Sequence, residues 1–139
     1  DPLSQAVLLE YAEPGRLEAH RARAREEGRR RLEATLAACA EYLPPGTRWT
    51  HPEGGMNVWV RLPEPLDAAE LLPRAQKEGV AYLPGRYFSV SRLDPGALRL
   101  SFAGLPPDQI RAGLAVLGRL LAAGQESASR ILEPAPAMV

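Results

Sequence analysis

The apolar positions of residues 1–43 predict two helices separated by the pair Pro14-Gly15. Residues 3–13 carry a short apolar run that stops at this pair, a combination that breaks helices. A second helix is predicted over about residues 16–43. Its large apolar side chains recur at helical spacing in the second half, at Leu32, Leu36, Cys39 and Leu43. We therefore expect this helix to pack on its own domain only along its last turns.

After residue 44 the pattern changes to alternation, which is typical of strands with one buried face. Residues 47–50 and 80–83 predict short strands, and residues 85–96 predict a loop. A longer strand is predicted where apolar residues occupy every second position, at Met56, Val58, Val60 and Leu62.

Residues 97–102 alternate in the same way. Leu98, Leu100 and Phe102 should face the core, because side chains two apart in a strand share a face. Arg99 and Ser101 should then point to the opposite face of the sheet.

Two further helices flank this last strand. Asp67 followed by Glu70 is a capping-box signature, Pro73 is expected in or near the first turn, and Gly79 marks the end of that helix. The final helix is predicted from the Pro106-Pro107 pair to about Ala123.

These elements predict an α+β fold with two layers, in which a mostly antiparallel sheet of about three or four short strands packs against helices. Residues 1–43 would form a helical arm, residues 44–123 a small domain, and residues 124–139, rich in Gly, Ser, Ala and Pro, a mobile C-terminal tail.

Composition narrows the function classes. The 17 basic and 17 acidic residues cancel, so no global field favours nucleic acid or an anionic membrane. No apolar run reaches the roughly 18 residues of a membrane span, and we expect no membrane partner and a cytoplasmic location. One cysteine, Cys39, with His20 and His51 gives poor support for a metal site, and Cys39 is expected to be a buried apolar residue.

The first half of the long helix is rich in charge, with seven arginines and three glutamates between residues 16 and 31. One interpretation is a solvated helix laced with Arg–Glu pairs, and a second is a surface that lies against a domain absent from this chain. A third is a basic nucleic-acid-binding module, which the glutamates and the lack of interleaved aromatic residues argue against.

Two residues are candidates for a binding or catalytic role because of their residue type and position alone. Arg99 would present a planar five-donor fork from a rigid strand, which suits bidentate binding of a carboxylate. The spacing alone favours an ordinary exposed strand arginine paired with a nearby glutamate. Lys77, the single lysine, could be read as a Schiff-base lysine, but its place at a helix end favours a solvated cation.

Three motifs in order carry a family resemblance. Residues 52–59 (PEGGMNVW), 78–85 (EGVAYLPG) and 97–102 (ALRLSF) resemble the C-terminal small domain of fold-type I, pyridoxal-phosphate-dependent aminotransferases, and the resemblance covers roughly residues 3–123. The arginine-rich helix, residues 48–50 and residues 101–105 are most similar to the aminotransferase-like domains of MocR-type, GntR-family transcriptional regulators.

The resemblance implies a function in outline. The first reading is the effector domain of such a regulator, which binds pyridoxal phosphate and an amino acid or amine, and contacts DNA only through a separate N-terminal domain. The alternative is the small domain of a free-standing aminotransferase of the aminoadipate or aromatic type, which transfers an amino group to a 2-oxo acid.

The resemblance also implies site residues. The α-carboxylate-binding arginine of the family falls on Arg99, and the segment that approaches the substrate includes Gly85, Tyr87 and Phe88. Arg86-Tyr87-Phe88 stands where many relatives have a small residue after the glycine, so the shape of the pocket is expected to differ.

The cofactor-binding groups of the family belong to a large domain, and no matching motif occurs in these 139 residues. The resemblance therefore implies a C-terminal piece of a longer protein, with the large domain as its partner and a homodimer as its assembly. Pyridoxal 5'-phosphate is expected in that longer protein and not in the isolated piece, which should hold no catalytic residue.

Overall fold

The computed structural model describes residues 1–12, 15–90 and 94–132. In chain order its elements are α1 (Pro2–Ala12), α2 (Arg16–Tyr42), β1 (Arg48–Trp49), β2 (Asn57–Arg61), α3 (Ala68–Lys77), β3 (Leu83–Pro84), the 3₁₀ turn η1 (Gly85–Tyr87), β4 (Ala97–Ser101) and α4 (Pro107–Leu132). The predicted α+β class is confirmed.

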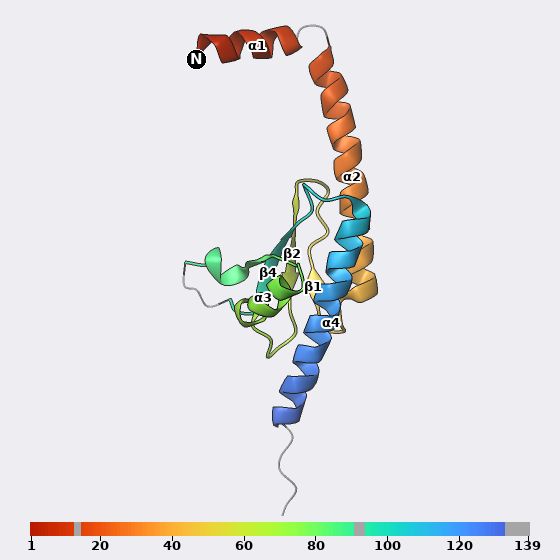
Figure 1. Ribbon diagram of the computed structural model, residues 1–139, viewed down its shortest axis with the longest axis vertical. Helices are drawn as coiled ribbons and strands as arrows, with labels where there is room; N and C mark the ends of the chain where they lie inside the picture. The colour runs from red at the N-terminus through yellow and green to blue at the C-terminus, as the bar shows by residue number, and fades with distance from the viewer. Residues whose placement is uncertain (13–14, 91–93, 133–139) are drawn as a thin grey trace, which may run out of the picture.

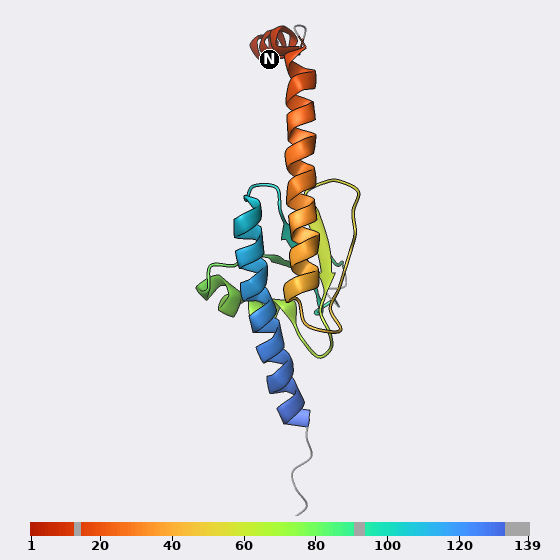
Figure 2. The same ribbon diagram turned by 90° about the vertical axis from the view of Figure 1, so that its right-hand side faces the viewer.

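The four strands form one antiparallel sheet in the order β1-β2-β4-β3. Helices α2 and α4 run side by side along one face of this sheet (Figures 1 and 2). The strand β4 therefore lies inside the sheet, between β2 and β3, with one face toward the helices.

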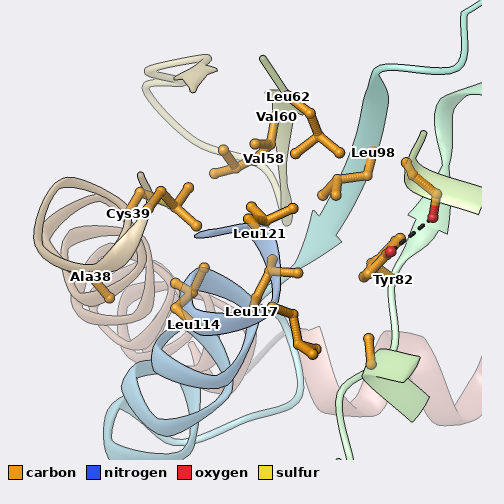
Figure 3. Packing of buried hydrophobic residues seen from close by; sticks show 14 of the residues in the cluster. Ala38, Cys39, Val58, Val60, Leu62, Tyr82, Leu98, Leu114, Leu117 and Leu121 are labelled. Atoms are coloured by element: carbon orange, nitrogen blue, oxygen red, sulfur yellow. Dashed lines mark hydrogen bonds between the residues drawn. The ribbon is translucent and has the colours of Figure 1, made fainter. Parts of the chain in front are cut away.

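The core lies between this face and the helices. Val58, Val60 and Leu98 are fully buried and point toward Leu117 and Leu121 of α4 (Figure 3). Leu98 and Phe102 are buried and Leu100 packs half-buried against the core, as predicted for one face of β4, and Arg99 is half-buried on the other face. Ala97 shares the face of Arg99 and is fully buried, so burial does not alternate strictly along the strand. Met56 departs from the expected buried face of its strand: it precedes β2 and is 60% exposed.

The long helix divides as its sequence predicts. The buried residues of α2 all lie in its second half, at Leu32, Thr35, Ala38 and Cys39. Its first half projects beyond the sheet and carries α1 at its far end (Figures 1 and 2). No residue of α1 is buried, and Leu3, Val7, Leu8 and Leu9 are each more than half exposed.

Helix α3 begins and ends where the sequence indicates. The Asp67 carboxylate accepts the N–H groups of Ala69 and Glu70, and Gly79 has a positive φ of 80°. The Val80 N–H donates to the Ala75 carbonyl, which completes a Schellman ending. Because Val80 belongs to this ending, the strand expected at residues 80–83 is instead β3, at Leu83–Pro84.

Two expectations for the helices are wrong. Pro73 lies in the second turn of α3 and not in or near its first. Helix α4 does not stop near Ala123 but continues to Leu132, so residues 124–132 of the expected tail are helical, and residues 133–139 lie outside the described part. The extension contacts the domain: a Cβ on Gly124 would lie 3.0 Å from Leu66 Cδ2, and the Gln125 amide donates to the Pro45 carbonyl.

Candidate functional site

Arg99 is held in the middle of the sheet. It is paired across the strands with Trp59 of β2 on one side and with Leu83 of β3 on the other. Residues directly opposite each other in antiparallel strands share a face. Trp59, Leu83 and Arg99 therefore lie together on the face that is turned away from α2 and α4, which we call the open face.

The guanidinium of Arg99 lies against an aromatic ring. Its Cζ atom is 4.8 Å from the centroid of the Phe88 ring, a distance at which a cation and a π face attract. Phe88 in turn meets Trp59 edge to face, with ring centroids 5.6 Å apart and an interplanar angle of 72°. Phe88 thus contacts both neighbouring side chains of the open face.

Arg99 has no protein carboxylate as a partner among the described residues. Its Nε atom is buried and has no hydrogen-bond acceptor there. Within the described part of the chain, Arg99 therefore does not form the pair with a nearby glutamate that its position in the strand favours. A buried N–H of this kind favours a site that takes an acceptor from outside these residues.

The segment 85–88 carries the other predicted site residues. Gly85 is buried where it crosses β4: a Cβ at this position would lie 2.7 Å from the Cβ of Ala97, so the glycine permits a close approach of two backbones. Phe88 closes the turn by donating its N–H to the Gly85 carbonyl at 2.9 Å. Tyr87 is 64% exposed, and no ring or hydrogen-bond contact joins it to Arg99.

Arg86 of the same segment forms an ion pair with Asp67, the residue that caps α3. This pair ties the segment to the start of a helix that is 19 positions away in sequence. The structure thus brings Arg99 and Phe88 into contact, holds Gly85 against Ala97, and leaves Tyr87 exposed. The roles of these residues toward a ligand stay predictions.

Trp59 and Leu83 belong to the open face beside Arg99 but are not predicted as site residues from the sequence. The alternation of β2 placed Trp59 on the face opposite Val58 and Val60, which was the available signal. The strand register that sets both residues beside Arg99 is a long-range property, and single-strand periodicity does not specify it.

Other candidates do not join this site. Lys77 is exposed at the end of α3. Cys39 is fully buried, and burial raises the pKa of its thiol to about 12, which keeps the thiol neutral. The described residues include no group of three or more His, Cys, Asp or Glu side chains that could hold a metal ion.

The arginines of α2 are largely paired along the helix. Arg21 pairs with Glu18, Arg29 with Glu26 and Glu33, and Arg30 with Glu26. These contacts agree with the interpretation of a solvated helix laced with Arg–Glu pairs. Over the described ranges, no helix is both long and apolar enough to cross a membrane.

The fold and the site together define an α+β small domain that presents a cation on the open face of its sheet. A family model for aminotransferase class I and II matches residues 3–117, and the chain therefore belongs to this family. It corresponds to the C-terminal part of such an aminotransferase.

Individual relatives agree with this assignment. The chain is 40% identical over 80% of its length to aromatic-amino-acid aminotransferase 1 of Thermococcus litoralis, of which it covers 27%. The multiple substrate aminotransferase of Thermococcus profundus superposes with a TM-score of 0.83 at 39% identity, covering 88% of this chain and 30% of that one. LysN of Thermus thermophilus, an α-aminoadipate aminotransferase solved with N-(5'-phosphopyridoxyl)-L-leucine, gives a TM-score of 0.75 at 38% identity, over 86% and 30% of the two chains.

Regulators match less strongly. The probable rhizopine catabolism regulatory protein MocR of Rhizobium meliloti is 29% identical over 97% of this chain, which covers 27% of that protein. The resemblance to aminotransferases is therefore confirmed. The comparisons support a free-standing aminotransferase better than the MocR-type regulator that the sequence motifs favour. The chain spans less than a third of the length of these relatives.

Proposed function

We propose that this chain is the small domain of a free-standing, pyridoxal-phosphate-dependent aminotransferase of the aromatic or aminoadipate type, and that Arg99 binds the α-carboxylate of its amino-acid or 2-oxo-acid substrate. The cofactor, when bound by the rest of the enzyme, withdraws electrons from the amino-bearing carbon of the substrate. The contribution of this domain is to bind and orient that substrate.

The observation that carries the proposal is the state of Arg99. Its guanidinium is held by a central strand, stacked on Phe88, and left without a carboxylate partner among the described residues. A planar fork of this kind binds a carboxylate through two parallel hydrogen bonds. Because the strand is rigid and the ring restricts the side chain, little freedom remains to be lost when the carboxylate binds.

The names of the similar proteins support the enzyme over the regulator. Those with 38 to 40% identity are named as aminotransferases for aromatic amino acids, multiple substrates or α-aminoadipate. MocR, at 29%, supports the regulatory alternative less. In either protein Arg99 would bind the same carboxylate, so the test of Arg99 applies to both.

The test compares two ligands of the full-length protein that share a phenyl ring and differ in one group. 3-Phenylpropionate has a carboxylate and no amine, and phenethylamine has an amine and no carboxylate. Replacing Arg99 with Gln should weaken 3-phenylpropionate by about 30-fold or more, because a charge-assisted bidentate contact contributes about 2–3 kcal/mol. Phenethylamine should change by less than about twofold. Equal effects on both dissociation constants would contradict the proposal.

Enzyme and regulator are separated by turnover. The full-length protein should convert L-phenylalanine or L-2-aminoadipate to the matching 2-oxo acid with 2-oxoglutarate as amino acceptor. Binding of either amino acid without any conversion, together with specific binding of DNA, would favour the regulator.

A further inference from the structure

An ion pair helps to hold the segment that carries Phe88 over Arg99. Arg86 of η1 contacts Oδ2 of Asp67, and the two side chains are 35% and 19% exposed. The other oxygen of Asp67, Oδ1, accepts the N–H of Ala69 at 2.7 Å and caps α3. Both oxygens are therefore used, one to begin a helix and one to hold η1.

A second contact fixes the chain just before η1. The Tyr82 hydroxyl is buried and donates to the carbonyl of Ala68, in the first turn of α3, at 2.7 Å. β3 then leads directly into Gly85, which lies against Ala97. The backbone on the β3 side is thus well anchored, and Arg86 supplies the anchor on the far side of the crossing.

The contacts form a continuous path from α3 to the open face. Asp67 holds Arg86, Arg86 lies two residues before Phe88, and Phe88 covers the Arg99 guanidinium. The contact joins one guanidinium nitrogen of Arg86 to one carboxylate oxygen of Asp67, and an ion pair that is only partly exposed is less screened than a surface pair. Loss of the pair would free η1 to move away from the sheet and would take the Phe88 ring with it.

We propose that Arg86 and Asp67 are positioning residues for carboxylate binding, which act by keeping the Phe88 ring on the Arg99 guanidinium. This inference rests on the proposed function of Arg99. It assigns to Arg86 a role in orienting the substrate-binding arginine without touching the substrate.

The test uses variants of the full-length protein that separate the ion pair from the helix cap. Arg86→Gln removes the cation. Asp67→Asn removes the anion but keeps an amide oxygen that caps α3, since Asn is as good an N-cap as Asp. Arg61→Gln is the matched control, because Arg61 lies on the same face of the sheet but pairs with Asp94, whereas the Phe88 ring contacts Trp59 and Arg99. Arg86→Lys keeps the positive charge, so it should keep the Arg99 resonance and the affinity for 3-phenylpropionate close to those of the wild type.

The first readout is spectroscopic and independent of activity. In ¹⁵N-arginine-labelled protein, the side-chain Nε–Hε resonance of Arg99, assigned with Arg99→Lys, should be shifted upfield by the Phe88 ring. Arg86→Gln and Asp67→Asn should each move it toward the value in Phe88→Leu, and Arg61→Gln should leave it in place.

The second readout is the ratio of the dissociation constants of 3-phenylpropionate and phenethylamine. Each single variant should weaken 3-phenylpropionate by about fivefold, equivalent to about 1 kcal/mol, with phenethylamine unchanged. The double variant should be no worse than either single variant, because both remove the same contact.

The outcomes separate this inference from the proposed function. If Arg99→Gln changes the ratio but Arg86→Gln leaves both the ratio and the resonance as in the wild type, the positioning role is wrong and the function of Arg99 stands. If Arg99→Gln leaves the ratio unchanged, both fall. Equal losses in Arg86→Gln and Arg61→Gln would mean a general effect of surface charge and would also overturn the positioning role.

Discussion

The two faces of the sheet are built from alternating residues of the same strands, yet they have opposite properties. Val58, Val60 and Leu98 on the helix side are fully buried. Their neighbours Trp59 and Arg99 on the open face are half-buried and contact Phe88. Burial of apolar area stabilises the first face, whereas the second leaves a cation available. Stability and binding should therefore be separable between adjacent positions.

The sharpest test of this difference compares two neighbours on β4. Leu98→Ala should lower the free energy of unfolding by about 3 kcal/mol, because it leaves a cavity between the sheet and α4. Arg99→Ala should lower it by less than about 1 kcal/mol, since it loses mainly the contact with Phe88. Urea denaturation followed by circular dichroism measures both.

In ligand binding the order of the two variants should be reversed, with the larger loss of affinity in Arg99→Ala. Arg99→Ala should weaken 3-phenylpropionate strongly, and Leu98→Ala should leave the dissociation constant nearly unchanged under conditions where it is folded. A loss of stability in Arg99→Ala as large as that in Leu98→Ala would show that the open face is part of the core.

A second prediction concerns how closely the helices cover the buried face. Gly118 of α4 lies against the end of α2, and a Cβ on Gly118 would be 2.1 Å from the Tyr42 carbonyl oxygen. Gly118→Ala must therefore push the helices apart and should cost about 2 kcal/mol of stability, even though alanine is the better helix former.

Gly113, in the same helix, is the control. The nearest atom to a Cβ at Gly113 is Val80 Cγ2 at 3.9 Å, an ordinary contact. Gly113→Ala should be neutral or stabilise the protein by up to about 1 kcal/mol, as helix propensity predicts. Thermal or urea unfolding of both variants tests the comparison, and similar losses in the two would contradict close helix packing as the cause.

Much of this contrast could be predicted from the sequence. The alternation over residues 97–102 is enough to place Arg99 and Leu98 on opposite faces of the sheet. The capping signals at Asp67 and Gly79 locate α3. These features depend on neighbours in sequence, for which periodicity and local hydrogen bonds are informative.

The remaining features depend on residues that are distant in sequence. The contact of Arg86 with Asp67 and the close approach of Gly118 to Tyr42 join separate elements. The extension of α4 to Leu132 was missed for the same reason, because contacts with Leu66 and Pro45 hold a segment whose composition predicts a tail. Local pattern cannot specify such contacts.

The smallest effect is expected at the outer end of the open face. Arg61 and Asp94 form two hydrogen bonds, of 3.0 and 3.2 Å, but the Arg61 side chain is 55% exposed. Solvent screens such a pair, so Arg61→Gln should change the free energy of unfolding by no more than about 0.5 kcal/mol. The small difference should shrink further when urea denaturation is repeated at high salt. A loss above about 1.5 kcal/mol that persists in salt would mean that side chains of the open face stabilise the sheet, and the assignment of stability to the helix side alone would then be wrong.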